Sequence, residues 1–132
     1  MAYLGKVYKF DREENFDGFL KSIGLSEEQV QKYLQYKPSS QLVKEGDKYK
    51  YISVSSDGTK ETVFESGVET DDVVQGGLPI KTTYTVDGNT VTQVVNSAQG
   101  SATFKREYNG DELKVTITSS EWDGVAYRYY KA

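Results

Sequence analysis

Short turn sequences recur along the whole chain and constrain its fold more than any other feature. Asp-Gly and Asn-Gly pairs supply the positive backbone φ that tight hairpin turns require. The segments between them are short and rich in Thr, Val, Tyr and Ile, which favour strands. Short strands separated at regular intervals by such turns predict an antiparallel sandwich or barrel. The expected turns are Glu45-Gly46-Asp47, Asp57-Gly58, Asp87-Gly88-Asn89, Asn109-Gly110-Asp111 and Asp123-Gly124, with Gln99-Gly100 as a further candidate.

One region shows helical rather than strand periodicity. Its apolar residues are spaced as on one face of an amphipathic helix. Asn15 is a plausible N-cap for this helix, and Gly24 is expected to stop it. The apolar stripe consists of Phe16, Phe19, Leu20 and Ile23.

A second helix is predicted directly downstream. Ser26 and Gln29 form a capping box, and Pro38 ends the helix because the residue before a proline avoids helical geometry. The expected order is one strand over about residues 5 to 14, a short helical hairpin, and some nine strands joined mostly by hairpins. Two short helices cannot cover a large sheet, but they can cover one end of a barrel, and closing the sheet removes its exposed edges.

Bulk composition narrows the possible functions. A chain of 132 residues fits one domain, residues 1–132. It contains no Cys and no His, which removes thiol nucleophiles, the commonest general base and the commonest metal ligands. We therefore expect no catalytic residues, no metal and no other cofactor.

Charge and hydropathy limit the partners and the location. The net charge of −4 argues against a nucleic-acid partner. The first 25 residues show no secretory pattern, and no apolar run approaches the roughly 20 residues of a membrane span. The sequence therefore favours a cytoplasmic protein, and we expect a monomer.

One arginine is predicted on the apolar side of a strand. Over residues 102–108 the even positions carry Ala, Phe, Arg and Tyr, whereas the odd positions carry Thr, Lys and Glu. Arg106 therefore belongs to the inner face. Alternation does not decide the orientation of Arg128, which shares a face with Ala126 and Tyr130.

An arginine on an inner wall needs compensation for its charge. It cannot lose its proton, and leaving it unpaired costs several kcal/mol. An internal carboxylate, a water-filled cavity or a ligand anion could compensate it. The inner faces of the last strands offer no obvious acidic partner, and a barrel of about ten strands is wider than side chains can fill. Water and a ligand anion are therefore the compensation that the sequence favours.

Several segments spread over the chain resemble one known family. They are residues 5–10 (GKVYKF), 15–20 (NFDGFL), Lys37-Pro38, 64–69 (FESGVE), 104–106 (FKR) and 128–130 (RYY). In this combination they resemble the intracellular lipid-binding proteins, which include the fatty-acid-binding proteins and the cellular retinoid-binding proteins. The likeness runs over essentially the whole length.

The resemblance implies a mainly β fold: a ten-stranded antiparallel up-and-down β-barrel (β-clam) of the calycin type, capped by a helix-turn-helix lid. It further implies an internal, water-containing cavity. Residue by residue, Arg106, Arg128 and Tyr130 would hold a ligand carboxylate, and Phe16 on the lid would contact the ligand tail. The implied function is that of a non-catalytic carrier that reversibly binds a long-chain fatty acid.

Alternatives remain within and outside this class. Members that carry retinol have glutamines at the two arginine positions, so two arginines favour an acid. Retinoic acid or another hydrophobic carboxylate is then the alternative ligand. A secreted lipocalin-type carrier is disfavoured by the shorter chain, the absence of a signal sequence and the absence of Cys.

The sequence departs from the family around the expected entrance. Many fatty-acid carriers have a phenylalanine at the turn that is Asp57-Gly58 here, and an acidic pair followed by arginine at Gly76-Gly77-Leu78. These changes leave the head-group residues in place but alter the expected entrance. Lys21, Lys32 and Lys37 on the helical lid are expected to be solvated, with transient contact to an anionic membrane as the alternative.

Overall fold

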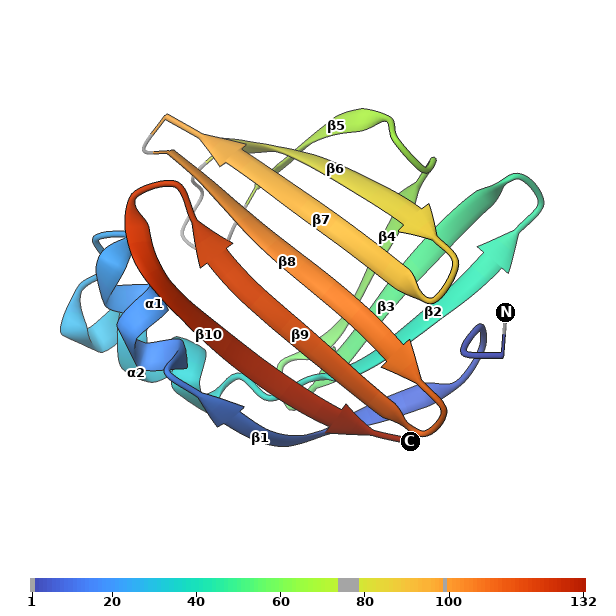
Figure 1. Cartoon of the computed structure of the whole chain (residues 1–132), viewed down its shortest axis with the longest axis horizontal. Coiled ribbons are helices and arrows are strands. Elements are labelled where there is room, and N and C mark those ends of the chain that lie inside the picture. Colours follow the sequence, from blue (N-terminus) through green and yellow to red (C-terminus); the bar gives the residue numbers. More distant parts are fainter. Residues whose placement is uncertain (1, 74–78, 99) are drawn as a thin grey trace.

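Ten antiparallel strands form one continuous ladder that curls into a nearly closed barrel (Figure 1). The computed structural model describes residues 2–73, 79–98 and 100–132. The strands follow the order β4-β3-β2-β1-β10-β9-β8-β7-β6-β5, so β4 and β5 are the two end strands. This confirms the predicted up-and-down barrel, including nine strands after the helices. The strands are β1 (Val7–Glu14), β2 (Ser39–Glu45), β3 (Lys48–Ser55), β4 (Gly58–Phe64), β5 (Glu69–Val73), β6 (Pro79–Asp87), β7 (Thr90–Ser97), β8 (Gly100–Asn109), β9 (Glu112–Ser119) and β10 (Trp122–Lys131).

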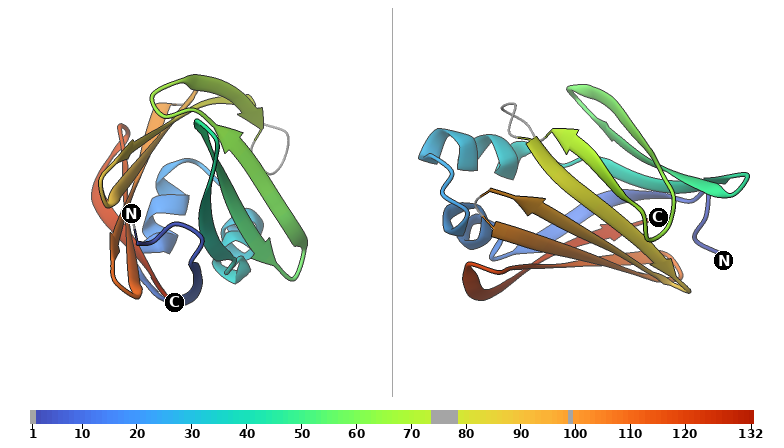
Figure 2. Two further views of the ribbon diagram at one scale, coloured as in Figure 1. Left: turned by 90° about the vertical axis from the view of Figure 1, so that its right-hand side faces the viewer. Right: turned by 90° about the horizontal axis from the view of Figure 1, so that it is seen from above.

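Two helices, α1 (Phe16–Ser22) and α2 (Glu27–Gln35), lie together at one end of the barrel (Figure 2). Inside this end, the ring of Phe19 packs against Phe104 and Trp122, at centroid distances of 5.9 and 6.1 Å. The predicted capping box of α2 is confirmed, since Ser26 Oγ accepts from the Gln29 backbone N–H and Gln29 Oε1 accepts from the Ser26 N–H. No helix among the described residues is long and apolar enough to span a membrane.

The start and stop of α1 follow the prediction, although the capping mechanism differs. Asn15 occupies the N-cap with a left-handed φ of 57°, but its side chain makes no capping hydrogen bond. Its Nδ2 instead donates to the Val125 carbonyl at 3.2 Å, which ties the lid to β10. Gly24, with φ of 84°, follows the C-cap residue Ile23 as expected.

Most of the predicted turns join consecutive strands, but the Asp123-Gly124 turn is wrong. These two residues lie within β10, where the ladder with β9 shifts register between Trp122 and Ala126. The chain instead reverses at residues 120–121, between β9 and β10. A glycine serves a bulge as readily as a turn, which explains the error. Gln99 and the segment Gly76-Gly77-Leu78 lie outside the described residues.

Alternation of buried and exposed side chains places the core inside the barrel. Leu113, Val115 and Ile117 of β9 are buried, as their pattern predicts. At the end opposite the helices, the ring of Tyr3 stacks on Tyr108 at 4.1 Å. The barrel is therefore covered by helices at one end and packed with aromatic side chains at the other. The candidate site lies between them.

Candidate functional site

Three charged side chains lie in one cross-strand row on the inner wall. Glu13 of β1 is opposite Arg128 of β10, Arg128 is opposite Val115 of β9, and Val115 is opposite Arg106 of β8. Since neighbouring strands are about 4.8 Å apart, the two arginine backbones are separated by about 10 Å. The two arginines that the sequence predicts for the site therefore share one level of the barrel.

Arg106 faces inward and is buried, as the alternation in β8 predicts, and its hydrogen-bond partners are neutral. Its side chain is 8% exposed. Nε donates to the Tyr51 hydroxyl at 3.3 Å, and Nη2 donates to Gln93 Oε1 at 2.9 Å. Nη1 has no hydrogen-bond partner among the described residues, and no carboxylate there forms an ion pair with this guanidinium. Arg106 therefore presents a buried positive charge with a free donor.

Arg128 also faces inward, which settles the orientation that alternation leaves open. It is 6% exposed. Its Nε donates to Glu13 Oε2 at 3.1 Å, and its Nη2 donates to the Tyr36 carbonyl at 2.8 Å. Its Cζ lies 4.6 Å from the ring centroids of both Phe10 and Phe16. The expectation that the arginines lack an acidic partner is therefore wrong for Arg128, because the partner comes from the first strand rather than the last ones.

A bulge in β1 turns Glu13 inward. Phe10 is opposite Tyr130 and Arg12 is opposite Tyr129, so Asp11 is an extra residue in β1. One extra residue moves every following side chain to the other face of the sheet. Simple alternation from the buried Tyr8 would have placed position 13 outside.

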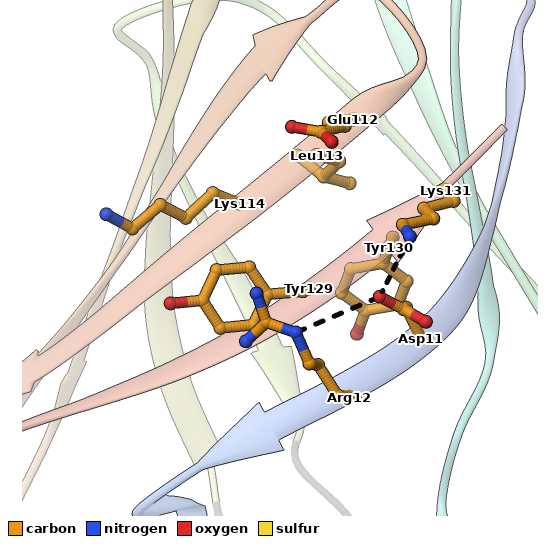
Figure 3. Close-up of a pocket in the computed structure, with 8 residues that line it drawn as sticks. All are labelled: Asp11, Arg12, Glu112, Leu113, Lys114, Tyr129, Tyr130 and Lys131. Carbon is orange, nitrogen blue, oxygen red and sulfur yellow. Dashed lines mark ion pairs between the residues drawn. The ribbon is translucent and has the colours of Figure 1, made fainter.

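The outer side of the bulge is held by ion pairs and by an aromatic contact (Figure 3). Asp11 lies 3.7 Å from Lys131 Nζ and 4.0 Å from Arg12 Nε. The Arg12 guanidinium lies 3.8 Å from the ring centroid of Tyr129, a favourable cation–π arrangement. These contacts surround a small external pocket of about 140 Å³ and fix the bulge that aims Glu13 at Arg128.

Tyr130 lies within electrostatic range of both guanidiniums. Burial raises the pKa of its phenol to about 12, while the positive charges of Arg128 and Arg106 oppose the rise. Its ring meets Phe10 edge to face at 5.7 Å. The hydroxyl therefore stays protonated at neutral pH and can donate a hydrogen bond.

Phe16 joins the lid to the same site. Its ring is buried, packs against Phe19 at 6.1 Å and covers the Arg128 guanidinium. The structure thus brings Phe16, Arg128 and Tyr130 together and places Arg106 in the same row. Contact between Phe16 and a ligand tail stays a prediction.

Sequence reasoning missed several neighbours of the arginines: Phe10, Glu13, Tyr36, Tyr51 and Gln93. Gln93 carried a readable signal, since it lies between Val91 and Val95 on one face of its strand. Glu13 carried none, because the bulge that turns it inward is invisible to alternation. Among the described residues, no group of three or more His, Cys, Asp or Glu side chains could hold a metal ion.

A groove of about 620 Å³ runs between α2 and the β3–β4 turn. The departure at Asp57 noted in the sequence lies here, so a polar turn stands at the expected entrance. Tyr36 lines the groove, and its carbonyl is the one that Arg128 binds, which connects the groove to the interior site. The lining residues are Lys32, Gln35, Tyr36, Lys37, Ser55, Ser56 and Asp57.

Comparison with known proteins assigns the family. Residues 1–128 match the profile of the lipocalin and cytosolic fatty-acid binding protein family. The chain belongs to this family. Among curated members, it is 56% identical to fatty acid-binding protein 2 of Manduca sexta, with complete coverage of both chains.

Solved structures of fatty-acid-binding proteins share the fold. The protein isolated from Manduca sexta superposes with a TM-score of 0.93 at 57% identity, covering 98% of this chain and 99% of that one. The Schistosoma mansoni protein, solved in complex with arachidonic acid, superposes with a TM-score of 0.89 at 26% identity, covering 98% and 95%. The ten-stranded barrel is therefore the fold that solved members of the family have.

Proposed function

We propose that this fatty-acid-binding protein family member is a non-catalytic carrier that reversibly binds one long-chain fatty acid inside the barrel. Arg106, Arg128 and Tyr130 would hold the carboxylate. The observation that carries the proposal is the buried Arg106 guanidinium, whose Nη1 lacks a partner among the described residues. Relatives named as fatty acid-binding proteins over the full length support the same ligand class.

The chemistry of the three side chains suits a carboxylate. A guanidinium can donate two parallel hydrogen bonds to the two oxygens of one carboxylate, and the Tyr130 hydroxyl can add a third donor. An ester or alcohol lacks the negative charge and would leave the buried Arg106 uncompensated. The arginines therefore select an acid.

The apolar tail would supply most of the affinity. Burial is worth about 0.8 kcal/mol per methylene, so a chain of about sixteen carbons gives roughly 13 kcal/mol before other terms. Association and ordering of the chain oppose this by several kcal/mol or more. Dissociation constants between about 1 μM and about 1 nM are then reasonable. Phe16, on the inner side of α1, is the lid residue proposed to contact the tail.

The proposal also covers the location of the protein, its oligomeric state, its alternative ligand and its contact with membranes. The protein would act in the cytoplasm as a monomer built from one domain, without a cofactor and without changing its ligand. Retinoic acid or another hydrophobic carboxylate is the alternative ligand. Transient membrane contact through the lid would bring Lys32 and Lys37, beside the groove, close to anionic lipid.

Mass spectrometry of lipids extracted from the purified protein tests this function. The wild type should yield fatty acids, whereas Arg106→Gln and Arg128→Gln should yield little. Lys105→Gln, on the outer face of β8, is the matched control and should behave as the wild type. A protein that carries no lipid and takes up no fluorescent acyl probe would overturn the proposal. Competition between oleate and retinoic acid for the probe separates the two ligand classes.

A further inference from the structure

The two inner arginines differ in their charge compensation. Arg106 contacts only neutral partners, Tyr51 and Gln93. Arg128 already has a carboxylate partner, since Glu13 accepts its Nε–H at 3.1 Å. Although both guanidiniums are buried in one cross-strand row, only Arg106 lacks an internal counter-charge among the described residues.

A count of charges in this row gives one uncompensated positive charge. Arg106 and Arg128 contribute two positive charges and Glu13 contributes one negative charge. On the end strands β4 and β5, Lys60 and Asp72 form their own pair at 3.7 Å and add no net charge. The described interior is therefore matched to a ligand that carries a single negative charge.

We propose that Glu13 is a specificity-determining residue, which limits the head-group site to monoanionic ligands by neutralising Arg128. This inference rests on the proposed function, because it concerns the head group of that same ligand. With Glu13 in place, the single negative charge of a ligand carboxylate neutralises the row formed by Arg106, Arg128 and Glu13. A dianion such as an alkyl phosphate would bring an excess negative charge into a buried site, where uncompensated charge is costly.

Glu13 has a second effect on the geometry of the site. With Nε held by Glu13 and Nη2 held by the Tyr36 carbonyl, the Arg128 fork is fixed between β1 and the chain that follows α2. The rings of Phe10 and Phe16 flank the same guanidinium. A ligand therefore meets a guanidinium of fixed orientation whose charge is already partly compensated.

The test compares two ligands with the same tail and different head-group charge. Palmitate is a monoanion, and hexadecyl phosphate carries close to two negative charges at about pH 8. Both dissociation constants are measured on lipid-stripped protein, and their ratio is the readout because it cancels tail contacts. The wild type should prefer palmitate, and Glu13→Gln should shift the ratio toward the phosphate by about tenfold or more.

Glu14→Gln is the matched control. It removes the same charge one residue away, but Glu14 is exposed and pairs with Arg12 on the surface at 3.3 Å. Its ratio should equal that of the wild type. An equal shift in both variants would overturn the proposal, since it would show a general effect of net charge.

A rescue experiment gives a second, independent outcome. Arg128→Gln leaves Glu13 opposed only by Arg106, so the row becomes neutral and palmitate binding should be weakest. Adding Glu13→Gln restores one positive charge. The double variant should therefore bind palmitate about tenfold tighter than Arg128→Gln alone. If Glu13→Gln alone does not fold, as judged by circular dichroism, the double variant carries the test because it leaves no lone charge at either position.

The outcomes separate this inference from the proposed function. A wild type that does not bind palmitate overturns the fatty-acid carrier. A wild type that binds palmitate, with an unchanged ratio in Glu13→Gln and no rescue in the double variant, overturns only the role of Glu13.

Discussion

Glu13 and Arg128 lie directly opposite each other on β1 and β10, joined by a 3.1 Å hydrogen bond between residues 115 positions apart in the chain. The side chains are only 21% and 8% exposed. A buried ion pair contributes little net stability, but removing one partner is costly because the other charge stays buried alone. Arg106 has no such partner among the described residues, so the same substitution should have opposite effects at the two arginines.

Arg128→Met should lower the free energy of unfolding of the ligand-free protein by about 3–5 kcal/mol, because it leaves Glu13 without its counter-charge. Arg106→Met should instead raise it by about 1–2 kcal/mol, because it replaces an uncompensated buried charge with an apolar side chain. Urea unfolding of both lipid-stripped variants gives the two values.

Lys105→Met is the control for this comparison. Its side chain is exposed on the outer face of β8, so we expect a change within about 0.5 kcal/mol. Equal destabilisation at positions 106 and 128 would contradict the difference in compensation that the structure shows.

The barrel architecture could be predicted because the local sequence patterns of its strands, helices and turns agree with the overall fold. The strand pattern of 113–117, the capping box at Ser26 and the glycine after α1 each survive in the structure. The alternation of polar and apolar residues also placed Arg106 correctly on the inner face, because the other face of its strand is clearly polar.

The surroundings of Arg128 could not be predicted from periodicity. Its charge partner depends on one extra residue in β1, and a bulge reverses the faces of the residues that follow it. The Asp123-Gly124 error has the same origin, since these residues accommodate an irregularity inside β10 rather than a turn. Bulges are set by how neighbouring strands fit in three dimensions, which a one-strand pattern does not contain.

Buried tyrosines should make the protein sensitive to alkaline pH. Burial raises the pKa values of Tyr84 and Tyr130 to about 12, above the unfolded value of about 10. The folded state then holds these protons more tightly, so this stability is fully present below about pH 10 and is lost as pH rises through about 12. Urea unfolding at several pH values, with tyrosinate absorbance recorded in parallel, should show a decrease of a few kcal/mol.

Phenylalanine substitutions identify which groups cause the alkaline effect. Tyr130→Phe and Tyr84→Phe should each flatten the decrease between about pH 10 and about pH 12, since each removes one raised group. If both variants lost as much stability as the wild type between these pH values, groups other than Tyr84 and Tyr130 would cause the alkaline effect.

The lysines beside the groove should govern delivery of ligand to membranes, if the lid makes the proposed contact. Lys32 and Lys37 line the groove between α2 and the β3–β4 turn, and each basic residue near an anionic surface is worth about 1 kcal/mol. Replacing both with glutamine should slow transfer of a fluorescent fatty acid to anionic vesicles several-fold and weaken its salt dependence. Lys114→Gln, on strand β9, is the control and should transfer as the wild type does. Wild-type transfer rates that do not change with salt concentration would contradict membrane contact.

Gly124 leaves room for the indole of Trp122, so adding a methyl group there should disturb both β10 and the lid. A Cβ at Gly124 would overlap the Trp122 ring, and that ring packs on Phe19 of α1 at 6.1 Å. Gly124→Ala should therefore lower the free energy of unfolding by about 1–3 kcal/mol, as overpacking does. Because Trp122 is the only tryptophan, its emission should shift to the red as the indole moves toward water.

Val125→Ala is the control for this substitution, since Val125 is exposed and follows Gly124 directly. It should change stability by no more than about 0.5 kcal/mol and leave the emission unchanged. Gly124 does not adopt a left-handed φ, so an alanine meets no backbone strain there and any cost must come from the displaced ring. A loss of stability in Gly124→Ala without a change in tryptophan emission would contradict this explanation, because the steric cost and the movement of Trp122 have one cause.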